Sequence, residues 1–263
     1  MPSRVSRSPR HSLFVFAHQD DECLLSTRIA REAAAGRRVH CVYLTAGSGP
    51  GVPSTVRDAE SRAVLADLGV AQADAHFVGS AHGIPDGSLP LHLVEAERRL
   101  EEAVGHQPIH RVFSMAYEGG HQDHDAAHVA ALVFARRRRL LHRTWAMPAY
   151  QGHRLPWILY RVATALPGRP RRVRRLPRRL AWRHAWLVWR YPSQWRSWVG
   201  LFPELFVQRA LRRREVLIPA DAEAIRGRPH AGSLLYERLF RFPYESFRRG
   251  VDAFLDARTA GDG

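Results

Sequence analysis

The stretch SLFVFAHQDDE, Ser12 to Glu22, places charge where a buried strand would end. Five apolar residues run straight into His18, and Asp20, Asp21 and Glu22 then stand side by side. The N-terminus of a following helix favours each negative charge by only about 0.3–1 kcal/mol, which is too little to hold three adjacent carboxylates beside a histidine. A divalent cation accounts for them better, because coordination replaces the repulsion. The stretch therefore predicts a metal site at the end of a strand.

A second cluster of the same kind follows another strand-like segment, residues 109–115. The chain continues as AYEGGHQDHD, so that His121, Asp123 and His124 come directly after a Gly-Gly turn that permits tight backbone geometry. Sites in open α/β sheets form at the carboxyl ends of the strands, and two parallel strands would bring both clusters to one edge. Two imidazoles and a carboxylate, with a fourth position open, are typical of catalytic zinc.

Short apolar runs alternate with segments of helical periodicity through the first half of the chain. The runs are apolar on both faces, as in buried parallel strands, and glycines follow three of the expected helices. This alternation predicts an α/β fold with a Rossmann-like, mostly parallel sheet and flanking helices. The expected strands are 13–17, 39–44, 76–78 and 109–115, and the expected helices are 21–35, 56–68, 91–104 and 123–138.

After about residue 150 this regularity fades, and proline and arginine interrupt residues 155–177. We therefore expect a catalytic α/β core with the metal site over residues 1–150. The remainder, residues 151–263, is expected to be an irregular or helical extension that completes the same domain and shapes the substrate pocket.

The composition is that of a globular protein, with 45% hydrophobic residues in a chain of 263. Two cysteines, Cys23 and Cys41, are too few for a disulfide framework and fit a reducing compartment. The N-terminal apolar run is too short for a signal peptide, and no run has the length of a membrane-spanning helix. We therefore expect a soluble, cytoplasmic protein.

The net charge of +15 arises from arginine, because the 40 basic residues include no lysine. The sequence also lacks asparagine, so part of the arginine excess reflects a GC-rich coding bias. The excess is nevertheless uneven, since residues 136–139 and 169–179 are strongly positive. This second half would suit an anionic or lipid-linked partner.

The two clusters also carry a resemblance to a known family. AHQDDE, followed about a hundred residues later by HQDH, resembles the AHPDDE and HPDH motifs of the PIG-L/LmbE-like family of zinc-dependent N-acetylglucosaminyl deacetylases. Between them, RDAESRAVLADLGV resembles a helix of that family and IPDGSL resembles its Asp-containing loop. The resemblance covers residues 12–150. Gln19 and Gln122 depart from it, because each replaces a motif proline that would stiffen the turn.

The resemblance implies a Zn²⁺ ion held by His18, Asp21 and His124, although the same ligands also accept Fe(II), Co or Ni. Asp20 would be the general base that deprotonates a metal-bound water and then protonates the departing amine. His121 would stabilise the oxyanion, with Asp123 orienting it.

Two further positions match family residues that contact the sugar, Arg57 and Asp86. Tyr117 lies near the place where some members carry a tyrosine, so its hydroxyl is a candidate for that part of the site.

Simpler interpretations exist for each feature. The first cluster could be a capped helix beside a partly buried histidine, and the second a polar loop. Arg57 and Glu60 could form a surface pair, and Asp86 could be an ordinary turn residue. The histidines at positions 76, 82, 92, 106 and 110 follow no pattern that indicates a function.

Trp182, Trp186 and Trp189 recur at helical spacing beside several arginines. This stripe could pack the C-terminal elements onto the core. It could also contact an anionic membrane surface, where Trp and Arg are favoured. Binding of single-stranded nucleic acid is a third interpretation, but no recognisable nucleic-acid motif supports it.

The sequence therefore predicts a zinc-dependent amidohydrolase that removes an N-acetyl or other N-acyl group from a small-molecule amino-sugar conjugate. One alternative is an amidase that uses the same metal centre on a sugar–thiol conjugate. Another, of a different class, is a basic module that binds a membrane surface or nucleic acid and retains a relic metal site.

Overall fold

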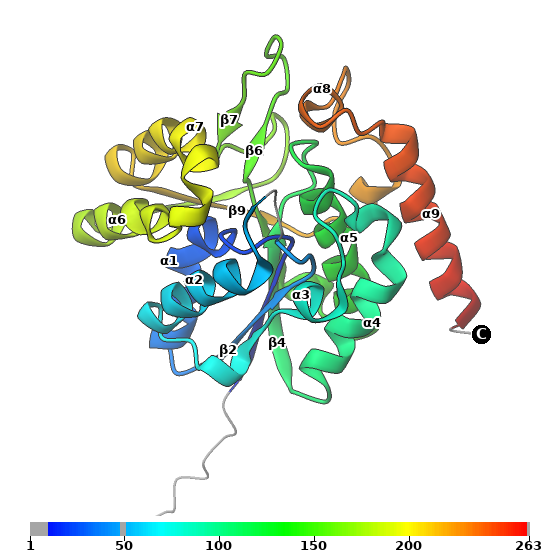
Figure 1. The fold of residues 1–263 in the computed structure, drawn as a ribbon, viewed down its shortest axis with the longest axis horizontal. Coiled ribbons are helices and arrows are strands. Elements are labelled where there is room, and N and C mark those ends of the chain that lie inside the picture. Colours follow the sequence, from blue (N-terminus) through cyan, green and yellow to red (C-terminus); the bar gives the residue numbers. More distant parts are fainter. Residues whose placement is uncertain (1–9, 48–50, 262–263) are drawn as a thin grey trace, which may run out of the picture.

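The computed structural model describes residues 10–47 and 51–261. In this part of the chain the main sheet has seven strands in the order β3-β2-β1-β4-β5-β9-β8, and a separate hairpin pairs β6 with β7 (Figure 1). The strands are β1 His11–Phe16, β2 Arg38–Tyr43, β3 Ala75–His76, β4 Ile109–Met115, β5 Thr144–Met147, β6 Tyr150–Gln151, β7 Arg161–Val162, β8 Arg172–Arg175 and β9 Arg214–Pro219.

Helices cover both faces of the main sheet (Figure 1). The helices are α1 Glu22–Ala34, α2 Ser54–Asp67, α3 Val78–His82, α4 Leu93–Val104, α5 Gln122–Arg137, α6 Arg178–Ala185, α7 Trp195–Phe206, α8 Leu235–Leu239 and α9 Tyr244–Gly261.

Strand β1 lies at the centre of the sheet and is buried along its whole length. Because successive side chains of a strand point to opposite faces, Leu13 and Val15 join the core under α4, α5 and α9. Phe14 and Phe16 point the other way and join the core under α1, α2 and α7. The continuous apolar run is thus explained by burial on both sides.

The expected fold class is confirmed. β3, β2, β1, β4 and β5 run parallel, and β1 pairs with β2 on one side and β4 on the other. The strand order reverses at β1, which is where doubly wound sheets form their sites, at the carboxyl ends of the strands. Gly36, Gly69 and Gly105 all have positive φ after the helices they were expected to end.

One sequence prediction needs correction. The strand expected over 76–78 is only β3, Ala75–His76, because Val78 already begins α3. The region after residue 150 also contributes to the main sheet, since β9 pairs antiparallel with β5 and β8 pairs with β9. Within the described residues, no helix is both long and apolar enough to cross a membrane.

Replacing Phe14 by alanine should test how much the central strand contributes to the stability of the fold. Its ring is fully buried and stacks on Phe113 with centroids 4.7 Å apart, so we expect a loss of about 3–5 kcal/mol in the free energy of unfolding, measured by urea denaturation. Val94→Ala, at an exposed position on α4, should change it by less than about 0.5 kcal/mol. Equal effects of the two substitutions would contradict this account of the core.

Candidate metal centre and active site

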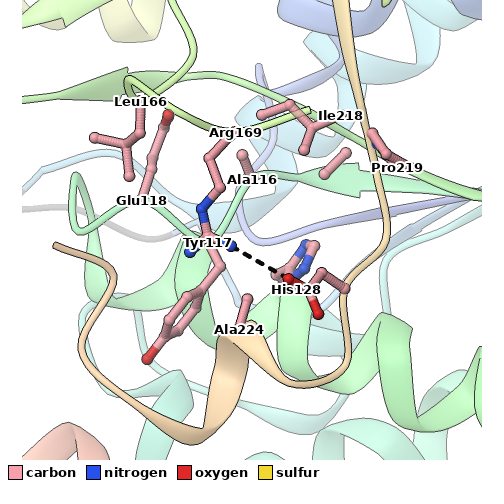
Figure 2. Close-up of a pocket in the computed structure, with 11 residues that line it drawn as sticks. Ala116, Tyr117, Glu118, His128, Leu166, Arg169, Ile218, Pro219 and Ala224 are labelled. Carbon is pink, nitrogen blue, oxygen red and sulfur yellow. Dashed lines mark hydrogen bonds and ion pairs between the residues drawn. The ribbon is translucent and has the colours of Figure 1, made fainter. Parts of the chain in front are cut away.

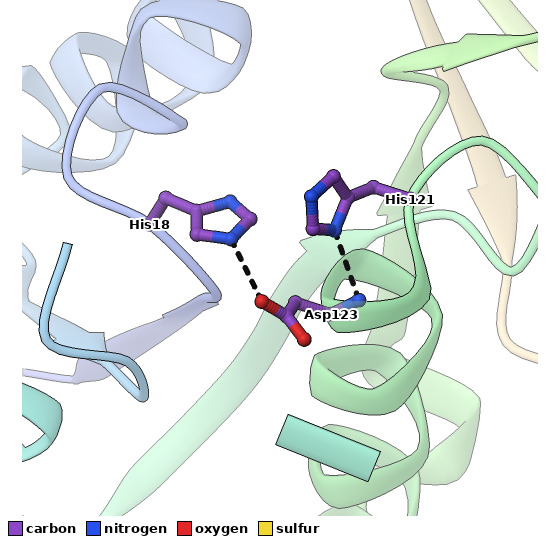
Figure 3. Close-up of side chains that lie close together, drawn as sticks. All are labelled: His18, His121 and Asp123. Carbon is purple, nitrogen blue, oxygen red and sulfur yellow. Dashed lines mark hydrogen bonds and ion pairs between the residues drawn. The ribbon is translucent and has the colours of Figure 1, made fainter. Parts of the chain in front are cut away.

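The two polar clusters meet at the carboxyl edge of the sheet. The loop after β1 carries His18, Asp20 and Asp21, and the loop after β4 leads into α5 with His121 at its N-cap. Because β1 and β4 are parallel neighbours, with Val15 opposite Ser114, both loops leave the sheet at the same place. Figure 3 shows His18 and His121 reaching toward one another from these loops above Asp123.

His18, Asp21 and His124 bring three potential ligand atoms together. His18 Nδ1 lies 3.3 Å from His124 Nε2, and His124 Nε2 lies 2.9 Å from Asp21 Oδ1. All three residues are buried, and their ligand atoms lie within 4.8 Å of one another. With bonds of 2.0–2.1 Å, the ligand atoms of a tetrahedral zinc site are about 3.3 Å apart, so the cluster has the dimensions of such a site.

Asp21 divides its two oxygens between the backbone and the cluster. Oδ2 accepts hydrogen bonds from the backbone N–H groups of Ala17 and His18, at 3.0 and 2.9 Å. Oδ1 faces His124. The first set of contacts fixes the carboxylate against the loop, and the second leaves one oxygen directed at the place where a cation would be held.

The electrostatics of the cluster favour positive charge. Burial alone would lower the pKa of His18, but the hydrogen bond to Asp123 and the nearby carboxylates of Asp86 and Asp21 outweigh it and raise the pKa to about 9. Burial would likewise raise the pKa of Asp21, yet His124 and His18 lower it to about 2. The residues therefore fit a divalent cation in donor type, spacing and charge.

Asp123 has a different partner from the one expected. Its carboxylate accepts from His18 Nε2 at 3.0 Å (Figure 3) and from the backbone N–H groups of Gly87 and Leu89. Its hydrogen bond with His121 is made by its own backbone N–H, which donates to Nδ1 of that ring at 3.1 Å. Asp123 therefore orients His18, because the carboxylate of this fully buried side chain is already engaged on both oxygens.

The same backbone contact determines the tautomer of His121. A ring nitrogen that accepts a hydrogen bond carries no proton in the neutral imidazole, so Nδ1 is the acceptor and Nε2 carries the N–H. Burial lowers the pKa of His121 well below its usual value, and the cationic forms of His18 and His124 act in the same direction. The ring is therefore a neutral hydrogen-bond donor.

Asp20 occupies a strained backbone position, with φ of 115° at a residue other than glycine. Its N–H donates to Glu22 Oε2 at 3.0 Å, which helps to hold this conformation. Its carboxylate has a single weak contact among the described residues, 3.4 Å from Arg57 Nη2. Burial raises the pKa of Asp20 to about 7, although Arg57 opposes the shift. It has free lone pairs beside the ligand cluster.

Arg57 and Asp86 hold three loops together. The guanidinium donates to the backbone carbonyls of Gln19 and Gly47, and it lies 3.3 Å from Asp86. Asp86 also accepts from the backbone N–H of Gly47 at 2.7 Å. Arg57 is therefore buried beneath the site rather than paired at the surface, while contact of either residue with a sugar stays a prediction. Glu60 instead accepts from the backbone N–H of Ser193.

The two glutamines that replace motif prolines are both buried and both anchored. The side-chain amide of Gln19 donates to Asp58 at 2.7 Å and to Ser80 at 3.0 Å, which ties the first loop to α2 and α3. The amide of Gln122 donates to the carbonyl of Gly87 at 3.0 Å. Side-chain hydrogen bonds thus restrain each loop where a proline ring is lacking.

Sequence reasoning missed three residues that support the site. Tyr191 donates to the buried carboxylate of Glu22 and also lies 2.9 Å from Ser61 Oγ. Through Glu22 it connects the C-terminal half of the chain to Asp20.

Tyr150, at the start of β6, packs its ring edge-on against His124 with centroids 5.4 Å apart. Gly120 lies so close to the backbone of Tyr150 that a Cβ there would be 1.8 Å from its carbonyl oxygen.

Tyr117 does not reach the cluster. Its hydroxyl donates to the carbonyl of Gly227 at 2.8 Å, and the ring lines a separate cavity together with His128 and Arg169 (Figure 2). His128 contacts Ser114 and the carbonyl of Met115 through Nδ1. This cavity contains none of the candidate ligands.

Comparison with known proteins agrees with the motifs. Residues 13–135 match the family model PIG-L, described as GlcNAc-PI de-N-acetylase. This segment belongs to the PIG-L family. The family suggested by the motifs is thereby confirmed. Among curated protein sequences, none matches the chain at a significant level.

Solved structures share the fold at low sequence identity. The zinc-inhibited form of a teicoplanin deacetylase has a TM-score of 0.59 at 19% identity, over 81% of this chain and 99% of that one. The A40926 pseudoaglycone deacetylase has a TM-score of 0.59 at 17% identity, over 81% and 97%. The N,N′-diacetylchitobiose deacetylase of Pyrococcus horikoshii has a TM-score of 0.56 at 15% identity, over 85% and 88%. These similarities establish an LmbE-like fold.

Asp123→Asn should weaken binding of Zn²⁺ about 10–100-fold, because an amide cannot accept from His18 and from two backbone N–H groups at once. Isothermal titration of the metal-free protein measures the affinity. Asp256→Asn, at an exposed position of α9, is the matched control and should leave it unchanged. An unaltered affinity in folded Asp123→Asn protein would contradict the positioning role.

Proposed function

We propose that this protein is a zinc-dependent hydrolase that removes an N-acetyl or other N-acyl group from an amino-sugar conjugate. The proposal rests on the convergence of His18, Asp21 and His124 at one place. Beside them lies the carboxylate of Asp20, which has free lone pairs. Membership of residues 13–135 in a family described as a de-N-acetylase supports the reaction class. The three similar structures described above are named as deacetylases, which agrees with it.

The metal would be held by His18, Asp21 and His124, with His18 oriented by Asp123. A zinc ion supplies Lewis acidity there: it polarises the amide carbonyl and favours deprotonation of a water molecule. An amide resists hydrolysis because its carbonyl is a weak electrophile, so this is the assistance that the reaction requires.

Asp20 is the base in this proposal. It accepts a proton from the attacking water, and the same carboxylic acid then gives that proton to the nitrogen as the C–N bond breaks. The products are a carboxylic acid and a free amine, which at neutral pH become a carboxylate and an ammonium ion, so atoms and charge balance. A pKa near 7 lets one group serve in both directions at neutral pH, and a positioned base is worth about 10²–10⁴ in rate.

His121 is placed to stabilise the negative charge that develops on the carbonyl oxygen. Its Nε2–H is available, because Nδ1 is already occupied by the backbone of Asp123. A preorganised neutral donor costs no reorganisation during the reaction, and removing one such donor typically lowers the rate about 10²–10³-fold.

Asp20→Ala should lower amine release by at least about 10²-fold, because the proton shuttle is lost while the three ligands remain. The assay offers N-acetylglucosamine as free sugar, nucleotide sugar, inositol- and lipid-linked forms and an antibiotic glycoside. A sugar–thiol conjugate tests the alternative amidase activity. Zinc is added to one equivalent, since a similar deacetylase is described in a zinc-inhibited form.

Asp256→Ala is the control and should retain the wild-type rate. Chelation should abolish release, and zinc should restore it. If Asp20→Ala and wild-type protein released equal amine from every acylated substrate, the proposed chemistry would be wrong. Binding of DNA, RNA or vesicles with no metal-dependent release would instead favour the binding-module alternative.

We further propose that the substrate is lipid-linked and is met at a membrane surface. Trp157, Ile158 and Leu159 form the tip of the β6–β7 hairpin and are 85%, 58% and 56% exposed. Figure 1 shows this hairpin projecting from the body of the molecule beside α7. Three consecutive exposed apolar side chains are costly in water and suit insertion into the lipid interface.

The same hairpin connects that tip to the site, because Tyr150 at its base contacts His124. Nearby, Trp182 packs on Phe206 and Trp186 on Phe202, which supports the packing interpretation of the tryptophan stripe. Both indoles nevertheless stay roughly half exposed, and arginines surround them in sequence. Aromatic rings with cations favour a surface of anionic lipid.

Replacing Trp157, Ile158 and Leu159 together by alanine should weaken binding to phosphatidylglycerol-containing vesicles at least about tenfold, because the inserted apolar area is lost. Vesicle sedimentation measures the bound fraction. Leu91→Ala combined with Val94→Ala removes exposed apolar area near α4 and should leave binding unchanged. Equal loss from both variants would refute a specific role of the hairpin.

A further inference from the structure

Three imidazoles stack across the neighbouring strands β1, β2 and β3. His11 in β1 lies over His40 in β2, with ring centroids 5.1 Å apart, and His40 lies 5.8 Å from His76 in β3. Both pairs are stacked, with interplanar angles of 20° and 16°. The three strands are parallel neighbours, so the sheet itself creates this arrangement.

Asp74, just before β3, adds a buried carboxylate to the stack. Its Oδ1 lies 3.5 Å from His40 Nδ1, and one ligand atom from each of His40, Asp74 and His76 lies within 4.8 Å of the others. Two imidazoles and a carboxylate at such separations match the donor set preferred by zinc and neighbouring transition metals.

Two ring nitrogens of the cluster are left without a hydrogen-bond partner among the described residues. His40 Nδ1 and His76 Nε2 are buried atoms that form no hydrogen bond within the described residues. His40 as a whole is almost fully buried. Buried polar atoms are nearly always satisfied, and a pair left open beside a carboxylate therefore points to a ligand.

His11 fixes which lone pair of His40 is free. His11 Nδ1 lies 2.9 Å from His40 Nε2. If Nε2–H donates to His11, then Nδ1 of His40 carries a lone pair directed toward Asp74. A metal-bound histidine usually donates its second N–H to a neighbouring acceptor in this way.

We propose that His40, Asp74 and His76 form a second binding site for a divalent transition metal such as Zn²⁺, with His11 orienting His40. Binding would join β2 to β3, which is the edge strand of the sheet. His40 lies opposite Leu13 of β1, five residues before His18 and so about 16 Å from it along the strand at 3.3 Å per residue. The role of the ion is therefore to stabilise the fold and not to catalyse.

The charges around the cluster limit its affinity but do not remove its ligands. Arg38 donates to both oxygens of Asp74, and Arg62 lies near His76. Burial lowers the pKa of His40 to about 4 and also lowers that of His76, so that both rings are neutral at pH 7 and keep their lone pairs.

The stoichiometry of zinc binding tests the inference. Metal-free protein is dialysed against buffered Zn²⁺, and bound metal is measured by elemental analysis. Wild-type protein should bind one more ion per chain than His76→Gln, which changes a partly exposed residue and should fold. His106→Gln, at an exposed position outside the cluster, should bind as much as wild type. This difference of one ion does not depend on what occupies the catalytic edge.

A second measurement isolates the site. His124→Gln removes a ligand at the catalytic edge, and Co²⁺ added to that variant should still give the visible absorption of a histidine- and carboxylate-bound ion. Adding His76→Gln should abolish it. Equal zinc content in wild type and His76→Gln, or no Co²⁺ absorption in His124→Gln, would overturn the proposal.

Discussion

The parallel pairing of β1 with β4 is the constraint on which the site depends. His18 and His124 are 106 positions apart in the chain, and the adjacency of these two strands brings His18 Nδ1 to 3.3 Å from His124 Nε2. The pairing is itself secured by side chains that are apolar on both faces, so that a core forms on each side of the sheet. The chemistry of the carboxyl edge thus rests on hydrophobic burial some distance below it.

The three adjacent carboxylates of the first loop are tolerated because each has its own surroundings. Glu22 accepts a hydrogen bond from Tyr191, and Asp21 contacts the backbone and His124. Asp20 lies beside Arg57. Their pKa values separate accordingly, with Asp21 lowered to about 2 and Asp20 raised to about 7. Neighbours in sequence therefore need not share an electrostatic environment, and one loop can supply both a ligand and a base.

The sequence predicted the central sheet and the convergence of the clusters, because strand periodicity and loop composition are local signals. It could not predict that Asp123 bonds His18 rather than His121, since that choice depends on how two loops pack. Nor could it single out His76, because a lone histidine has no meaning until the sheet places His40 and Asp74 beside it. The role of Tyr191 was hidden for the same reason: its partner Glu22 is 169 positions away.

The position of β9 has a consequence for how the chain can be divided. The family segment ends at residue 135, and the parallel strands end with β5. Without β9, the backbone N–H and C=O groups along one side of β5 would lose their partners, and a bare strand edge invites pairing with other molecules. A protein cut between β5 and β9 would therefore keep every candidate ligand of the catalytic edge and yet be prone to aggregate.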